Sequence, residues 1–194
     1  VYLALQHLER AEQLMQHPVT LVINNAGVGL GGKFDETSLA DWQWVTHVNL
    51  WGVINGVQVF GEDMALSGRP GLIINTGSKQ GITTPPGDPA YYVAKAGVKA
   101  FTEALQHELR NTPDCNVTAH LLIPGFVFTS LTANGRTDKP AGAWTPEETV
   151  DFMFESLDRG DFYILCPDNE AARPQDEKRM TWAIGLCEKT RDVM

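Results

Sequence analysis

The feature that most constrains this chain is the alternation of short apolar runs with longer segments that carry helix-start signals. Residues 19–24, Val-Thr-Leu-Val-Ile-Asn, form a near-continuous β-branched run, which is typical of a parallel strand covered on both faces. Three further runs predict strands of the same kind, at residues 71–76, 116–123 and 161–166. Strands that alternate with helices predict βαβ units with right-handed crossovers, and therefore an α/β fold built on a parallel sheet.

Helix-start signals lie between these strands. Ser38 has the side chain of an N-cap, Asp88 is a cap residue followed by a first-turn proline, and Thr145 opens a Thr-Pro-Glu-Glu capping box. We expect helices at residues 38–65, 88–111 and 145–160, with a further helix leading in at 2–16 and one in the tail at 173–189.

Length and composition favour one domain that spans residues 1–194. The chain has 194 residues, of which 43% are hydrophobic and 20% charged, and this suits a single core. The long irregular stretch 126–144 follows a predicted strand end, where loops of open α/β sheets usually cover ligands. We therefore expect 126–144 to be a substrate loop and 170–194 to be a C-terminal tail.

Charge and residue usage disfavour several classes of partner. The formal net charge of -9 leaves no basic field to attract nucleic acid or an anionic membrane surface. The longest apolar runs are far shorter than the roughly 20 residues that span a bilayer. The cysteines have no C-x-x-C spacing and the histidines no metal-ligand spacing, so we expect reduced thiols, a cytoplasmic location and no metal. The chain opens on Val1 with no visible targeting segment, and we interpret this start as cut rather than processed.

Tyr91 and Lys95 are the first candidates for chemistry. Their Tyr-x-x-x-Lys spacing places a phenol and an ammonium on one helix face, one turn apart. A free tyrosine titrates near pH ~10, and bringing it close to neutrality needs roughly 4 kcal/mol of preferential stabilisation of the phenolate. A nearby ammonium has the correct sign for this. The alternative is an exposed i,i+4 pair without a role in catalysis.

Ser78 lies just after the predicted strand 71–76. A hydroxyl at the carboxyl end of a strand faces the ligand crevice of an α/β sheet and could hydrogen-bond a substrate carbonyl. The alternative is a turn serine that satisfies its own backbone. A serine hydrolase is disfavoured, because residues 76–80 read Thr-Gly-Ser-Lys-Gln and lack the first glycine of G-x-S-x-G.

Four motifs, taken in order, resemble the short-chain dehydrogenase/reductase family. They are Asn24-Asn25-Ala26-Gly27 after the first strand, Asn49 in the middle of a helix, Ser78 ahead of Tyr91-x-x-x-Lys95, and Pro124-Gly125-x-Val127-x-Thr129 after a later strand. The resemblance covers residues 2–166. It implies a Rossmann-like, doubly wound parallel sheet in a three-layer α/β/α arrangement.

The resemblance also implies a role for each residue. Tyr91 would be the general acid/base, Lys95 the cation that lowers its pKa and binds the nicotinamide ribose, Ser78 the substrate-orienting hydroxyl, and Asn49 the amide that holds a relay water. The residues expected to bind NAD or NADP are Asn24, Ala26, Gly27, Tyr91, Lys95, Pro124, Gly125, Val127 and Thr129. The implied reaction is hydride transfer between the cofactor and a small carbonyl or alcohol substrate, in a homodimer or homotetramer.

The sequence departs from the family at its start. Family members begin with strands and a glycine-rich turn that do not precede Val1, so three strands should be absent and about four remain. Residues 27–32 also match G-x-G-x-x-G, but the next helix begins only near residue 38, so we interpret these glycines as a loop. We expect strand 19–24 to be an exposed apolar edge and the chain alone to bind cofactor poorly. The alternative to an active enzyme is a truncated or degenerate fragment without turnover, acting as a binding or oligomerisation subunit.

Overall fold

A single parallel sheet organises the chain. The computed structural model describes residues 13–14, 16–133, 135–167 and 174–181. Within these residues the sheet has four strands in the order β1-β2-β3-β4, with every neighbouring pair parallel. The strands are β1 (Leu21–Asn24), β2 (Gly71–Thr76), β3 (Val117–Ile123) and β4 (Tyr163–Leu165). This confirms the predicted α/β class and all four strands, although β1 and β4 are shorter than predicted.

The helices begin where the capping residues predicted. Ser38 caps α2 (Leu39–Thr46) through a capping box with Asp41, Asp88 caps α4 (Pro89–Asn111), and Thr145 caps α5 (Pro146–Asp158) through a capping box with Glu148. The other helical segments are η1 (His47–Trp51), α3 (Gly52–Leu66) and the 3₁₀ turn η2 (Lys79–Gly81). Residues 174–181 are also helical, whereas most of the two predicted terminal helices, 2–16 and 173–189, lies outside the described residues.

The helix predicted over residues 38–65 is present, but its interior is not regular α-helix. A π-helical segment, η1, separates α2 from α3, and the Gly52 N–H donates to His47 O across the widened turn. A π-turn changes the direction in which side chains leave the helix, and such turns occur often at functional sites. Asn49 lies within η1 and is 0% exposed. The interruption therefore coincides with one of the predicted site residues.

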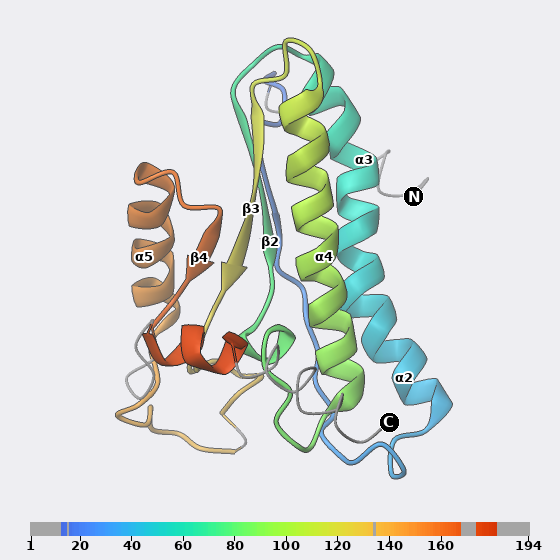
Figure 1. Ribbon diagram of the computed structural model, residues 1–194, viewed down its shortest axis with the longest axis vertical. Helices are drawn as coiled ribbons and strands as arrows, with labels where there is room; N and C mark the ends of the chain where they lie inside the picture. Colours follow the sequence, from blue (N-terminus) through green and yellow to red (C-terminus); the bar gives the residue numbers. More distant parts are fainter. Residues whose placement is uncertain (1–12, 15, 134, 168–173, 182–194) are drawn as a thin grey trace.

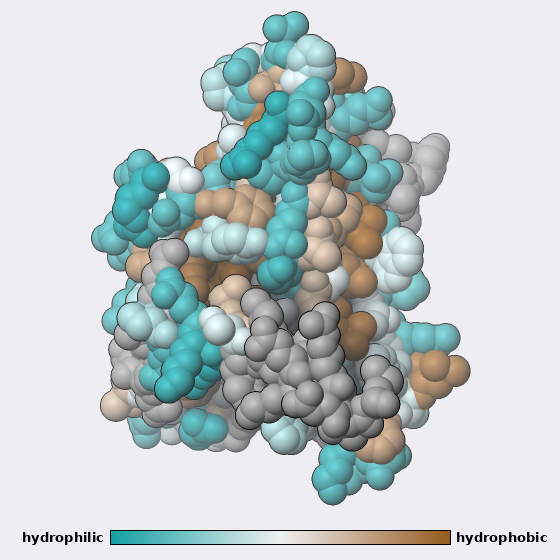
Figure 2. Space-filling model, viewed as in Figure 1, coloured by the Kyte–Doolittle hydropathy of each residue, from teal (hydrophilic) through white to brown (hydrophobic). Residues whose placement is uncertain are grey.

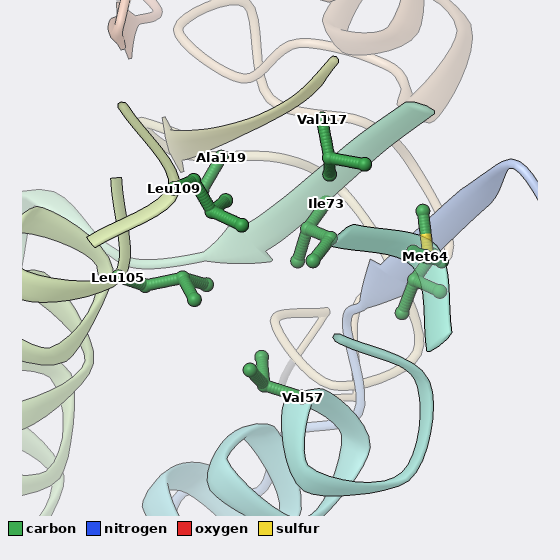
Figure 3. Close-up of a cluster of buried hydrophobic side chains, with 8 residues drawn as sticks. Val57, Met64, Ile73, Leu105, Leu109, Val117 and Ala119 are labelled. Atoms are coloured by element: carbon green, nitrogen blue, oxygen red, sulfur yellow. The ribbon is translucent and has the colours of Figure 1, made fainter. Parts of the chain in front are cut away.

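Helices cover both faces of the sheet. Figure 1 shows α3 and α4 on one face and α5 on the other, which is the predicted three-layer arrangement. The largest core cluster lies between the sheet and the α3/α4 layer, and Figure 3 shows most of its side chains pointing toward one another. It consists of Val22, Val57, Met64, Ile73, Leu105, Leu109, Val117 and Ala119. Because α4 packs on the central strands, its first two turns are held at the carboxyl end of the sheet.

The α5 face is covered less completely. Met153 of α5 packs with Ile74, Leu122 and Ile164 in a second cluster. In Figure 2 brown, hydrophobic surface is visible between the regions that α5 and α4 occupy in Figure 1. Leu21 and Ile23 of β1 are 45% and 46% exposed, so the edge strand presents apolar side chains to solvent within the described structure. In the described part of the chain, no helix is long and apolar enough to cross a membrane.

Candidate active site

The end of β2 and the start of α4 bring Ser78 and Tyr91 together. Ser78 follows β2, and its hydroxyl accepts a hydrogen bond from Gln80 N at 3.2 Å, which caps η2. The Ser78 side chain is also hydrogen-bonded to the Tyr91 phenol. Ser78 and Tyr91, 13 positions apart in the sequence, thus lie together in the lining of one cavity.

Lys95 lies one turn after Tyr91 on the same helix. Its Nζ is 5.8 Å from the centre of the Tyr91 ring and donates a 2.7 Å hydrogen bond to Thr76 O, at the last residue of β2. The side chain is buried, with 3% of the residue exposed. A surface i,i+4 pair would leave this ammonium in water, so burial against a strand end removes that alternative.

Burial shifts the pKa values of this pair in opposite directions. It lowers the pKa of Lys95 to about 8, because the ammonium loses solvation. It raises the pKa of Tyr91 above the ordinary value of 10.0, an effect that the Ser78 hydrogen bond opposes and the charge of Asp88 adds to. The sequence predicted a lowered pKa for Tyr91 through Lys95. In the chain without a cofactor, burial is the largest influence and the pKa of Tyr91 is raised, so the effect of Lys95 stays a prediction.

Asn49 positions the loop after β1. Its Oδ1 accepts from Val28 N at 2.9 Å and its Nδ2 donates to Val28 O at 2.7 Å, so one buried amide holds both polar groups of one loop residue. A Cβ added at Gly27 would lie 3.0 Å from Asn49 Oδ1 and 3.9 Å from Lys95 Nζ. The loop backbone therefore passes near the Lys95 ammonium, and the missing side chain at Gly27 leaves room for the closer Asn49 Oδ1.

Asn24 and Ala26, which belong to the Asn-Asn-Ala-Gly motif after β1, lie in different environments. Asn24 Nδ2 donates to Asn75 Oδ1 at 2.8 Å, and Asn75 Nδ2 in turn donates to Thr102 Oγ1 at 3.1 Å. The Asn24 side chain thus ties β1 to β2 inside the sheet, although the sequence analysis assigned it to the cofactor. Ala26 is exposed in the loop that follows.

A cavity of about 1000 Å³ opens in front of Ser78 and Tyr91. Pro124 and Gly125, which follow β3, line it together with Phe126. Val127 and Thr129 of the same motif lie outside the set of residues that line this cavity. Val127 forms an isolated bridge with Trp144, and Thr129 N donates to Thr132 Oγ1 at 3.0 Å, so these two residues fold the 126–144 segment back on itself.

Two contacts at this site were not predicted from the sequence. A Cβ at Gly81 would meet the backbone of Lys95 at 2.8 Å, so only glycine allows η2 to rest on α4. Lys79, next to Ser78, forms a 2.8 Å ion pair with Asp176 of the helix 174–181. Figure 1 shows this helix at the same end of the sheet as η2. The adjacency of Lys79 to Ser78 was the available signal, but a charged residue after a strand gives no information about a partner almost a hundred positions away.

Comparison with known proteins decides the family. The family model described as short chain dehydrogenase matches residues 4–140. This chain belongs to the short-chain dehydrogenase family. Its four-stranded parallel sheet with helices on both faces is the corresponding Rossmann-like fold.

Individual relatives agree with this assignment. The chain is 35% identical over 154 residues to nodulation protein G of Rhizobium sp. (strain N33), covering 79% of this chain and 61% of that protein. It is 35% identical over 116 residues to a 3-oxoacyl-acyl-carrier-protein reductase of Synechocystis sp., covering 60% of this chain and 45% of that protein. A short chain dehydrogenase/reductase from Burkholderia phymatum, solved in complex with NAD, superposes with a TM-score of 0.73 at 32% identity, over 83% of this chain and 66% of that one. The chain thus spans about half the length of these curated relatives.

Proposed function

We propose that this chain carries the catalytic residues of an NAD(P)-dependent oxidoreductase that interconverts a carbonyl and an alcohol. The observation that carries the proposal is the hydrogen-bonded Ser78 and Tyr91 pair facing the cavity, with the Lys95 ammonium buried behind it. Family membership and the NAD complex of the Burkholderia phymatum relative support the choice of cofactor. The Synechocystis and Rhizobium relatives leave the substrate open.

Tyr91 would donate the proton in the reducing direction. Its raised pKa keeps the phenol protonated at neutral pH, so the hydroxyl hydrogen is available to a substrate carbonyl oxygen. The Ser78 hydroxyl, bonded to that phenol, would hold the same oxygen. In reduction the carbonyl carbon gains a hydride and the oxygen gains the Tyr91 proton; oxidation reverses both transfers. The hydride chemistry belongs to the nicotinamide cofactor when it is bound.

The loop beside Lys95 fits a nucleotide sugar. Gly27 leaves backbone open next to the Lys95 ammonium, and Asn49 fixes that loop through Val28. An ammonium held by one backbone carbonyl retains further N–H donors for ribose hydroxyls. We therefore assign Lys95 to cofactor binding as well as to the stabilisation of the Tyr91 phenolate. Asn49 is a positioning residue for the loop.

The 126–144 segment remains the proposed substrate loop, because Phe126 and Thr132 line the cavity. A homodimer or homotetramer also remains a proposal. Exposed apolar side chains of the helical layer support it: Trp44 of α2, Trp51 of η1 and Val93 of α4. Light scattering on the purified gene product tests the oligomeric state, and a monomer would contradict it.

The decisive variant is Tyr91→Phe, with Tyr92→Phe as its matched control. Tyr92 is the next residue on α4, and it is buried outside the set that lines the cavity. We expect Tyr91→Phe to lower the rate of carbonyl reduction by about 100-fold or more while NADH or NADPH binding is retained, and Tyr92→Phe to leave the rate within a few-fold. Equal activity in both variants would refute the assignment.

Cofactor binding distinguishes an enzyme from a subunit without turnover. Nicotinamide fluorescence is followed while NADH and NADPH are titrated into the 194-residue chain and into any longer product of the same gene. Binding and turnover by the longer product support the oxidoreductase. Absence of both from every form would support a binding or oligomerisation subunit instead.

A further inference from the structure

The charge on the cavity wall is of one sign. Among the described residues that line the cavity, the charged ones are Lys79, Lys178 and Arg179, all cationic. The whole chain has a formal net charge of -9, so a described lining whose charged residues are all cationic runs against the composition of the protein. A low-dielectric cleft lined by one sign of charge attracts ligands of the opposite sign.

The buried carboxylate of Asp176 holds two of these cations in place. Asp176 is 0% exposed and lies between Lys79, at 2.8 Å, and Arg179, at 3.4 Å. One buried carboxylate thus anchors the helix 174–181 on η2, beside Ser78. Lys79 and Arg179, two of the three cations in the described lining, thus share this one carboxylate.

The remaining lining combines apolar side chains with the hydroxyls and amides of Gln80, Thr83, Thr84, Thr132 and Gln175. Ile82, Pro85, Pro86 and Phe126 contribute carbon surface, while Ser78 and Tyr91 supply the proposed reaction end. A ligand that satisfies all of these groups has a carbonyl or alcohol at one end, an apolar body and an anionic group at the other.

We infer that the substrate is an anionic carbonyl or alcohol compound whose carboxylate or phosphate is bound by Lys178 and Arg179. This inference rests on the proposed function and specifies its substrate class. Arg179, whose guanidinium also lies 3.4 Å from Asp176, has further N–H donors for either acid, and Lys178 adds a point charge. Lys79 is already committed to Asp176 and serves to position the helix.

Three aldehydes that share a ring test this inference. They are 4-carboxybenzaldehyde, 4-formylphenyl phosphate and the neutral ester methyl 4-formylbenzoate. Binding of each to the purified chain is measured by calorimetry, and NAD(P)H-dependent reduction of each is measured separately. We expect at least one acid to bind about 10-fold more tightly than the ester, with the preference falling as salt is raised. The stronger of the two acids identifies a carboxylate or a phosphate substrate.

Substitutions test which residues cause the preference for the acids over the ester. Lys178→Gln leaves the ion pairs of Asp176 in place, and Arg179→Gln removes the second cation; each should reduce the preference for the acid several-fold and leave ester binding unchanged. Arg110→Gln, an exposed arginine in the last turn of α4 outside the cavity lining, is the matched control and should change neither.

The outcomes separate the inference from the proposed function. Acid preference that is lost in Lys178→Gln and Arg179→Gln supports the inference even where no aldehyde is reduced. Reduction of the ester as readily as the acids, with equal binding, would overturn the inference and leave the oxidoreductase intact. Loss of NADH or NADPH affinity in the two variants, with acid binding unchanged, would also overturn it, because the cations would then serve the cofactor.

Discussion

At the scale of the residue, the main electrostatic feature of the site is the buried ammonium of Lys95. Its ammonium is 3% exposed and touches a backbone carbonyl, and among the described residues its pKa is one of the few that are strongly shifted. A charged group held in this way costs stability unless another interaction compensates. This cost in stability is what we expect for a lysine that has a chemical role.

The cost of burying the Lys95 ammonium predicts that the stability of the chain depends on pH. The pKa of Lys95 is about 8 in the folded chain and 10.5 for an ordinary lysine. Between these values the unfolded chain binds more protons than the folded one, so the contribution of Lys95 to stability rises with pH over this window and is most unfavourable below pH 8. The free energy of unfolding of the wild type, minus that of Lys95→Met, should rise by up to about 3 kcal/mol from pH 7 to pH 10.5. Denaturant unfolding across this range measures it.

Lys99→Met controls for the loss of a positive charge on the same helix, since Lys99 is partly exposed and paired with Glu103. The difference between the wild type and this variant should change much less with pH. A flat curve for Lys95→Met would mean that its ammonium remains solvated.

Asn49 supports a second prediction at the same scale. Asn49→Ala removes both hydrogen bonds to Val28 and leaves backbone groups of the loop unpaired, so we expect a loss of about 2 kcal/mol of stability. Asn111→Ala, which removes one exposed bond to His107 O, should cost less than about 1 kcal/mol. Chemical denaturation ranks the two, and an equal cost would show that the Val28 contacts contribute little.

At the scale of the element, the site depends on how closely η2 rests on α4. Ser78 is the N-cap of η2, and Tyr91 and Lys95 belong to α4, so their relative positions follow from this contact. The contact is made at Gly81, where a side chain would meet helix backbone. Backbone cannot move aside as a flexible side chain can.

Gly81→Ala should therefore impair the site through geometry. A Cβ 2.8 Å from the Lys95 backbone forces η2 away from α4, and we expect a loss of about 2 kcal/mol of stability together with at least a 10-fold fall in carbonyl reduction. Gly52→Ala is the matched control, because its Cβ would meet nothing closer than 3.8 Å and alanine favours a helix by up to about 1 kcal/mol. Thermal unfolding and activity are measured on both. An unchanged Gly81→Ala would show that the contact does not hold Ser78 in place.

At the scale of the whole molecule, the sheet has an apolar edge within the described structure. β1 is the first strand in the sheet order, and Leu21 and Ile23 point away from the α3/α4 core, in which Val22 is buried. Exposed apolar edge strands pair with other chains. This agrees with the expectation from the sequence that strand 19–24 would be exposed.

We expect the 194-residue chain to self-associate with rising concentration, beyond any defined dimer or tetramer. The double variant Leu21→Thr/Ile23→Thr places β-branched threonine, which favours strands, at both positions while removing apolar surface, so it should reduce this association. Leu39→Ser, at an exposed helix position, is the control and should not reduce it. Light scattering over a concentration series decides, and equal scattering by all three proteins would place the cause elsewhere.

The amino-acid sequence is enough to predict features that depend on neighbours along the chain. The strand runs, the caps at Ser38, Asp88 and Thr145 and the common face of Tyr91 and Lys95 all follow from spacings of a few residues, and the structure confirms them. The π-turn at Asn49 was not predicted, because apolar periodicity does not distinguish it from a regular helix.

The packed fold, in contrast, sets which residues far apart in the chain come into contact. Asn49 is hydrogen-bonded to Val28, 21 positions away, and Asn24 to Asn75, 51 positions away. Lys79 forms its ion pair with Asp176, in a helix far along the chain. It also decided the direction of the pKa shifts in the site, since desolvation depends on the packing around a group and not on its neighbours in sequence. The spacing of Tyr91 and Lys95 predicted a lowered tyrosine pKa, and burial produced a raised one.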